Sequence, residues 1–195
     1  MKLYRPTGQI ELELVFASGM RAWPPRLVDQ PIFYPVLNRT YAREIAAKWN
    51  TKSERLVGYV TTFEVDDELV TRYERKVVGN STHEELWVPA EDLPQLNARL
   101  QGPIEVLDAY FGDGFRGHVL EKGPFAGLSA DEQLEHLRAN TYLVPRIVKD
   151  HPLAVFLHYA RWVESSSDSL LCGEVADAWT RFGPNYKLPG GVEAA

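Results

Sequence analysis

The chain lacks the features that mark several common classes of protein. It has a single cysteine, Cys172, which excludes an intramolecular disulfide and any cysteine-rich metal site. No apolar run approaches the roughly 20 residues that a membrane-spanning helix requires. The N-terminal stretch MKLYRPTGQIELEL contains no apolar segment of the kind found in a secretory signal. We therefore expect a cytoplasmic protein with no membrane partner.

Motifs for the commoner nucleotide- and metal-dependent chemistries are also missing. The sequence contains no GxGxxG after a strand, no GxxxxGK[ST] phosphate loop and no GxSxG nucleophile elbow. The five histidines are scattered without an HExxH pair, which argues against a zinc site. A net charge of −6 disfavours nucleic-acid binding by the chain as a whole, although a local basic patch can still bind a nucleic-acid end.

What is present is typical of a globular protein of mixed structure. The 195 residues are 45% hydrophobic and 25% charged, enough for one domain plus a small addition. Strand-like patterns end near residue 111, and residues 112–127 carry five glycines, as in a long loop or a boundary. We predict an α+β domain over residues 1–118 and a helical region over residues 128–188.

In the first part, alternation and turn residues predict strands and helices in mixed order. Residues 10–16 alternate as in a strand, but their apolar residues also share a helical face, and Gly19 would end a helix there. We expect a helix at this place. The other expected elements are strands at 2–6, 31–36, 57–65 (a central strand), 86–89 and 103–111, a helix capped by Thr40, a turn or short helix from Asp66 to about Tyr73, a turn at Gly79–Asn80 and a helical segment near 94–100.

After residue 127 the pattern predicts about three helices. Ser129 and Glu132 have the spacing of a capping box. Residues 151–163 and 170–182 are helix-like and are joined by a Ser-rich linker at 165–169. The segment 151–163 carries more apolar area than a free-standing helix tolerates. It should therefore cover the N-terminal domain or form a homodimer.

The segment His83-Glu84-Glu85 places two carboxylates at the start of the apolar strand LWVP. Strand alternation sends Glu84 and Glu85 to opposite faces, so at most one can point into a given cleft. A carboxylate held at a strand end can polarise a ribose hydroxyl and stabilise positive charge that develops on a sugar. The alternative is that both are solvated turn acids.

Four other residues have side chains suited to a nucleotide. Arg5, on the first strand, can hold a phosphate or carboxylate through two hydrogen bonds; the alternative is an edge-strand charge paired with a nearby acid. Tyr34 and Tyr41, with Asn38 between them, can stack on and hydrogen-bond a planar amide ring. The alternative is that the tyrosines belong to the core with their hydroxyls at the surface.

The order of these motifs along the chain resembles that of a known protein family. LYRPTG, the amphipathic stretch to Gly19, IFYPVLN with YAREIAAKWN, GYVTTFEV and HEELWVPAEDLP together resemble small bacterial proteins of the ADP-ribosylation/crystallin J1 type. More distantly they resemble the ADP-ribosyltransferase fold, including DarT-type DNA ADP-ribosyltransferases. The resemblance covers roughly residues 3 to 117. It implies a core of two small, mostly antiparallel sheets with flanking helices, to which the C-terminal helices are an extension.

The resemblance also implies an activity. Glu85 matches the catalytic glutamate before an apolar strand, Arg5 matches the first-strand position, and Tyr34 or Thr61–Thr62 matches the middle position. NAD would be the substrate, bound by Arg5, Tyr34, Asn38, Tyr41 and Thr61, and ADP-ribose would pass to an acceptor that is a protein, a nucleic acid or a small molecule. Transferases that modify arginine carry Glu or Gln two residues before the catalytic Glu, where this chain has His83, which argues against an arginine acceptor.

Two alternatives stay open at this level. An NAD glycohydrolase would use the same residues with water as the acceptor. A catalytically silent member would bind a nucleotide or a partner protein through the same cleft.

Overall fold

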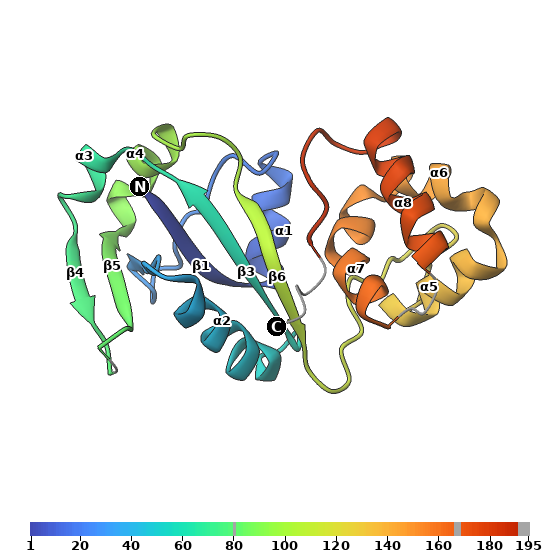
Figure 1. Cartoon of the computed structure of the whole chain (residues 1–195), viewed down its shortest axis with the longest axis horizontal. Helices are drawn as coiled ribbons and strands as arrows, with labels where there is room; N and C mark the ends of the chain where they lie inside the picture. Colours follow the sequence, from blue (N-terminus) through green and yellow to red (C-terminus); the bar gives the residue numbers. More distant parts are fainter. Residues whose placement is uncertain (80, 166–168, 191–195) are drawn as a thin grey trace.

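The computed structural model describes residues 1–79, 81–165 and 169–190, and it is a mixed α+β structure. Two small antiparallel sheets of three strands form the N-terminal part, and helices form the C-terminal part (Figure 1). Asn80 of the expected turn and residues 166–168 of the expected linker lie outside the described residues. The α+β class is therefore confirmed.

The first sheet has the order β1-β3-β6, all antiparallel. Its strands are β1 (Lys2–Gly8), β3 (Val57–Glu64) and β6 (Glu105–Phe111). The central position of β3 is confirmed, and every residue of this strand except Glu64 is buried. Helices cover both faces of the strand, so its alternating pattern does not mark a solvent-facing side.

The second sheet has the order β2-β5-β4, formed by β2 (Ile32–Phe33), β5 (Glu84–Pro89) and β4 (Glu74–Val77). Val36 joins the two sheets, because its backbone exchanges hydrogen bonds of 3.0 and 2.7 Å with Tyr4 and it also bridges to Glu85. The strand β4 was not predicted from the sequence. It is a largely exposed edge strand rich in charged residues, so no apolar alternation marks it.

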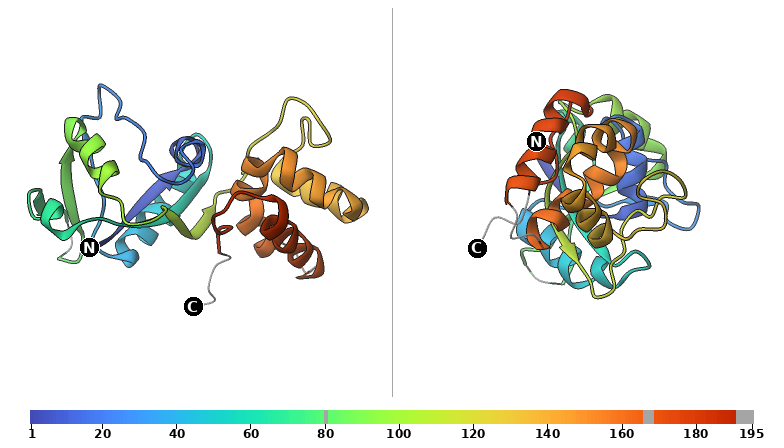
Figure 2. Two further views of the ribbon diagram at one scale, coloured as in Figure 1. Left: turned by 90° about the horizontal axis from the view of Figure 1, so that it is seen from above. Right: turned by 90° about the vertical axis from the view of Figure 1, so that its right-hand side faces the viewer.

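Helices of the N-terminal part lie on both faces of the first sheet: α1 (Gln9–Ala17) contacts β1 and β3, and α2 (Arg39–Lys48) contacts β1, β3 and β6 (Figures 1 and 2). Gly19 has φ 73° just after α1, as expected for a residue that ends a helix. The other helices are α3 (Asp67–Val70), α4 (Leu93–Ala98) and the short 3₁₀ turns Asn50–Lys52 and Ala90–Asp92.

The start of α2 differs from the prediction. Asn38, rather than Thr40, is the N-cap, and its Oδ1 accepts a hydrogen bond of 2.7 Å from the backbone N–H of Tyr41. Thr40 lies two residues after the N-cap and is already helical. Both residue types cap helices well, so the local sequence did not discriminate between them.

The C-terminal part consists of α5 (Ala130–Ala139), α6 (Val144–Asp150), α7 (Pro152–Ser165) and α8 (Ser169–Phe182), with a 3₁₀ turn at Thr141–Leu143. The capping box of Ser129 and Glu132 is confirmed. The expectation of about three helices missed α6, a seven-residue helix with a proline in its first turn. Within residues 1–79, 81–165 and 169–190, no helix has the length and apolarity needed to cross a membrane.

The helix α7 contacts α1 and β6 of the N-terminal part, and Figure 2 shows the two parts side by side. The rings of Phe16 and Phe156 lie 5.1 Å apart, and Tyr59 donates a hydrogen bond of 2.9 Å to the carbonyl of Leu157. Most of the apolar residues of α7 are thus buried within a single chain, and Val163 is exposed.

Candidate functional site

Glu85 lies at the start of β5, between Val36 on one side and Lys76 of β4 on the other. Its carboxylate is half-buried, and its Oε1 accepts a hydrogen bond of 2.9 Å from the hydroxyl of Tyr41, on α2. Burial, and then this contact with Glu85, raises the pKa of Tyr41 to about 12. Tyr41 therefore stays protonated at neutral pH and holds the Glu85 carboxylate as a hydrogen-bond donor.

The ring of Tyr41 is itself held in place. It stacks on the imidazole of His83, with ring centroids 4.0 Å apart and planes 7° from parallel. His83 Nε2 lies 3.2 Å from Oε2 of Glu44, one turn further along α2. The side-chain amide of Asn38 donates to the carbonyl of Thr82 while its oxygen caps α2. These contacts join the start of α2 to the turn before β5, so the Tyr41–Glu85 pair is supported from both sides.

Aromatic side chains gather on the same face as Glu85. Tyr4, Val36 and Glu85 oppose one another across three neighbouring segments, and directly opposed residues share a face. Tyr34, two residues before Val36, falls on this face too. Its ring meets that of Trp87 edge-on, with centroids 5.3 Å apart. We call this surface the Glu85 face; it consists of Tyr4, Tyr34, Tyr41, His83, Glu85 and Trp87.

A buried carboxylate that the sequence analysis missed lies beyond α2, on β6. Asp108 is fully buried, and both Arg39 and Arg43 of α2 hold it through paired hydrogen bonds of 2.8 to 3.0 Å. Burial alone would raise the pKa of Asp108, but the hydrogen bonds from Arg43 and Arg39 hold it below its usual range. An acid in an apolar strand, together with arginines four residues apart on a helix, is the signal that could have revealed it.

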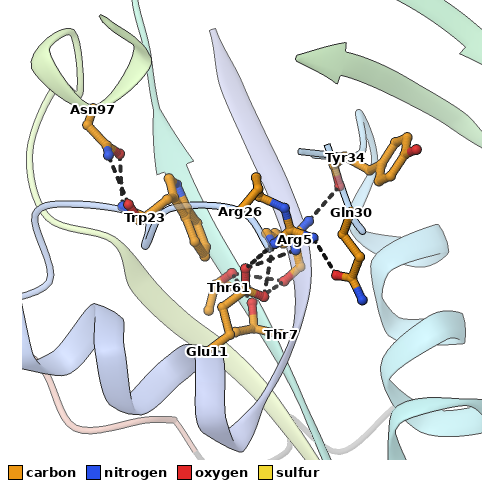
Figure 3. Close-up of polar contacts among 9 residues, drawn as sticks. All are labelled: Arg5, Thr7, Glu11, Trp23, Arg26, Gln30, Tyr34, Thr61 and Asn97. Carbon is orange, nitrogen blue, oxygen red and sulfur yellow. Dashed lines mark hydrogen bonds and ion pairs between the residues drawn. The ribbon is translucent and has the colours of Figure 1, made fainter. Parts of the chain in front are cut away.

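The side chain of Arg5 lies on the opposite face of β1 from the Glu85 face. It is 8% exposed, and its guanidinium makes hydrogen bonds of 2.9 to 3.1 Å to the carboxylate of Glu11, on α1 (Figure 3). A further bond of 3.1 Å goes to the carbonyl of Tyr34, and the group lies 4.5 Å above the ring of Phe33. Arg5 is therefore paired with a nearby acid, and the pair is in the interior.

Thr61 is buried beside Arg5 on the same side of the sheet. Its hydroxyl donates to the carbonyl of Arg5 at 2.8 Å and lies 3.0 Å from the hydroxyl of Thr7 (Figure 3). These bonds tie β1 to β3. The hydroxyl of Thr61 thus has structural partners within the first sheet.

The structure therefore divides the six predicted residues into two groups. Tyr34, Tyr41 and Glu85 share one face, and Asn38 fixes its edge. Arg5 and Thr61 pair across β1 and β3 and lie on the opposite face, because Arg5 follows Tyr4 in the strand and successive side chains alternate. A cavity of about 600 Å³ lies elsewhere, between the start of β6 and α8, and none of the six lines it.

Comparison with known proteins gives no family or function for this chain. No protein-family model, curated protein or solved structure matches the chain, so its function is inferred from its own residues.

Proposed function

We propose that this chain is an NAD-dependent ADP-ribosyltransferase-like protein in which Glu85 is the catalytic carboxylate. The observation that carries the proposal is the oriented pair on the Glu85 face: a half-buried carboxylate at a strand end, fixed by the hydroxyl of Tyr41 at 2.9 Å. A fixed negative charge beside a sugar stabilises the positive charge that develops there when the bond to a leaving group loosens.

The proposed reaction uses this charge directly. The bond between nicotinamide and the ribose breaks, nicotinamide leaves with the bonding electrons, and the ribose becomes oxocarbenium-like. Glu85 accepts a hydrogen bond from the 2′-hydroxyl of that ribose, and an acceptor nucleophile then forms the new bond and loses its proton. The acceptor is a protein, a nucleic acid or a small molecule; if it is water, the protein is an NAD glycohydrolase.

Aromatic rings next to Glu85 supply the platform for nicotinamide in this proposal. Tyr34 presents a half-buried ring on the Glu85 face and Trp87 packs against its edge. Tyr41 is tied to Glu85 and His83, so its contribution is to orient the carboxylate. Asn38 contributes indirectly, since both ends of its amide are used at the start of α2.

A second candidate is a catalytically silent module that binds a nucleotide or a partner protein. The observation that favours it is the position of Arg5, which the resemblance pairs with Glu85 in one NAD site. Arg5 is paired with Glu11, a carboxylate that it shares with Arg26, and it lies on the opposite face of β1 from Tyr4. A site without this arginine would hold the phosphates of NAD less tightly.

One experiment separates the two. Purified protein is incubated with NAD, nicotinamide release is followed, and NAD binding is measured by calorimetry on the same preparation. Release of nicotinamide supports the enzyme. Binding without release, with protein, nucleic-acid and small-molecule acceptors each supplied, supports the silent module. Absence of both binding and release at millimolar NAD would contradict the proposal.

A further inference from the structure

The side of the first sheet opposite Glu85 contains a buried cluster of three charged side chains. Arg5 and Arg26 both contact Oε1 of Glu11, at 2.9 and 3.2 Å (Figure 3). Their side chains are only 9%, 11% and 17% exposed for Arg5, Arg26 and Glu11 respectively. Arg26 reaches the cluster from the loop that follows α1, and the other two come from β1 and α1.

The cluster carries a surplus of positive charge, because two guanidinium groups share one carboxylate. The remaining hydrogen bonds of these arginines within the described residues go to neutral oxygens, the carbonyl of Tyr34 and the amide oxygen of Gln30. Asp29, another acid of the loop, is exposed to solvent. Burial, and then the charge of Arg5, lower the pKa of Arg26. An uncompensated buried charge is strongly destabilising, so an anion bound here would stabilise the cluster.

Two buried hydrogen-bond donors of the same loop have no acceptor in the described residues: the indole Nε1 of Trp23 and Nε of Arg26. Both groups donate only. Trp23 is 2% exposed, and the guanidinium of Arg5 lies 5.8 Å from the centre of its ring. Buried donors in native proteins almost always have partners. Donors alone, together with surplus positive charge, indicate a ligand that accepts hydrogen bonds and is negatively charged.

The loop that carries these donors is anchored at both ends. The backbone N–H of Trp23 donates to Oδ1 of Asn97 at 2.8 Å, and the side-chain amide of Asn97 donates back to the carbonyl of Trp23 at 2.9 Å (Figure 3). At the far end, the backbone N–H of Ala90 donates to the carbonyl of Pro31 at 2.8 Å. Pro24 and Pro25 restrict the backbone just before Arg26. The donors are therefore held in place before any ligand arrives.

We propose that Arg5, Arg26 and Trp23 form a binding site for a small oxyanion, a carboxylate or a phosphate group, beneath the loop that follows α1. A single negative charge beside Glu11 makes the cluster neutral, and the oxyanion accepts hydrogen bonds from Trp23 Nε1 and Arg26 Nε. The site lies on the opposite face of β1 from Glu85. It therefore does not depend on the activity proposed above.

Nuclear magnetic resonance of the tryptophan indole N–H groups tests the site directly. The chain has five tryptophans, and the Trp23 signal is assigned by its loss in Trp23→Phe. Inorganic phosphate and acetate are titrated separately at constant ionic strength, with chloride as the background anion. We expect the Trp23 signal to move saturably with one of the two, which identifies the oxyanion. The signal of Trp162, whose N–H already donates to the Ala130 carbonyl at 2.8 Å, should stay in place.

Two matched variants test whether the surplus positive charge of the cluster binds the oxyanion. Arg26→Gln removes the surplus charge and should weaken binding by about tenfold or more, because charge-assisted hydrogen bonds are the stronger kind. Arg21→Gln changes an exposed arginine of the same loop and should bind like the wild type. If Arg26→Gln does not fold, the loss of the anion-dependent rise in melting temperature in Trp23→Phe tests the same site. No saturable movement in the wild type with either anion, or equal binding by a folded Arg26→Gln, would overturn the proposal.

Discussion

The hydroxyl of Tyr41 donates a hydrogen bond of 2.9 Å to the carboxylate of Glu85 across 44 residues of sequence. The contact links the helix that covers the first sheet to the start of a strand in the second. Two features bring these groups together. Asn38 caps α2 so that Tyr41 lies in its first turn, and Val36 joins the two sheets beside Glu85. A carboxylate held in this way has a defined direction, which is the property that the proposed chemistry requires.

Glu85→Gln should therefore abolish most of the nicotinamide release while leaving the fold and NAD affinity unchanged. Losing one fixed charge at a transition state costs about 3–4 kcal/mol, or a factor of a hundred or more in turnover. Glu84→Gln is the matched control, because Glu84 pairs with Val77 on the other face of β5 and should be nearly silent. Equal losses in the two variants would show that the catalytic carboxylate has been wrongly assigned.

Tyr41→Phe removes the hydroxyl that orients Glu85 and keeps the ring that stacks on His83. We expect about a tenfold loss of turnover, since a single hydrogen bond contributes about 1 kcal/mol and one to a charged group somewhat more. The melting temperature should change little. Tyr110, on β6, packs with Tyr41 against one small apolar cluster, and Tyr110→Phe should behave as the wild type in the same assay. An unchanged turnover in Tyr41→Phe would mean that Glu85 does not need this bond.

Gly58→Ala should destabilise the protein strongly by pushing α2 away from β3. A Cβ at residue 58 would lie 2.3 Å from the carbonyl oxygen of Ala46, an atom of the helix backbone that cannot move alone. We expect a loss of about 1–3 kcal/mol or more in the free energy of unfolding, as for other overpacked sites. Gly8→Ala, with open space around the added carbon and an ordinary φ of −80°, should change the stability little in the same urea titration.

Local sequence patterns predicted most of the elements but could not place them relative to one another. The capping box of Ser129 and Glu132 and the helix end at Gly19 depend on residues a few positions apart, and both are as expected. The relation of Arg5 to Glu85 depends instead on the register of Tyr4, Val36 and the strand β5, which are far apart in the chain. A shift of one residue in that register would have placed Arg5 on the Glu85 face.

The missed features share a physical cause. The strand β4 is charged and exposed, so its pairing with β5 leaves no periodic signal in its own residues. Asp108 stands out in the sequence as an acid in an apolar strand, but its partners are set only when β6 lies under α2, which brings Arg39 and Arg43 to it. Both are consequences of tertiary contacts, which override local propensity.

Asp108→Asn tests the buried ion pairs under α2. Removing one charge of a buried group of ion pairs leaves its partners uncompensated and typically costs about 3–5 kcal/mol; because Arg39 and Arg43 are partly exposed, we expect the lower end of that range. Since the pKa of Asp108 is lowered in the folded state, the wild type should lose this stability as the pH falls through that folded pKa. Asp113→Asn, at an exposed site just after β6, should have no comparable effect on urea denaturation at pH 7.

The last prediction concerns the joint between the two parts of the chain, where His158 of α7 is fully buried. Its Nε2 accepts a hydrogen bond of 2.7 Å from the backbone N–H of His118, and its Nδ1 lies 3.0 Å from Oε1 of Gln133. The ring is therefore neutral, with its proton on Nδ1. Burial, and then the nearby His118, lower the pKa of His158 to about 3, against the smaller opposite effects of Asp131 and Glu13.

A histidine whose pKa is lowered on folding binds a proton more readily in the unfolded chain. Its contribution to stability is complete above about pH 6.5 and should fall by up to about 1.4 kcal/mol per pH unit as the pH drops toward 3. His158→Phe should be less stable at pH 7, because it loses both hydrogen bonds, but its stability should be flatter between pH 6.5 and 4.5. Urea denaturation across this range measures the slope, with His151→Gln, at a partly exposed histidine, as the control. If the unfolding free energies of the wild type and His158→Phe change equally with pH, protonation of His158 does not contribute to the loss of stability at low pH.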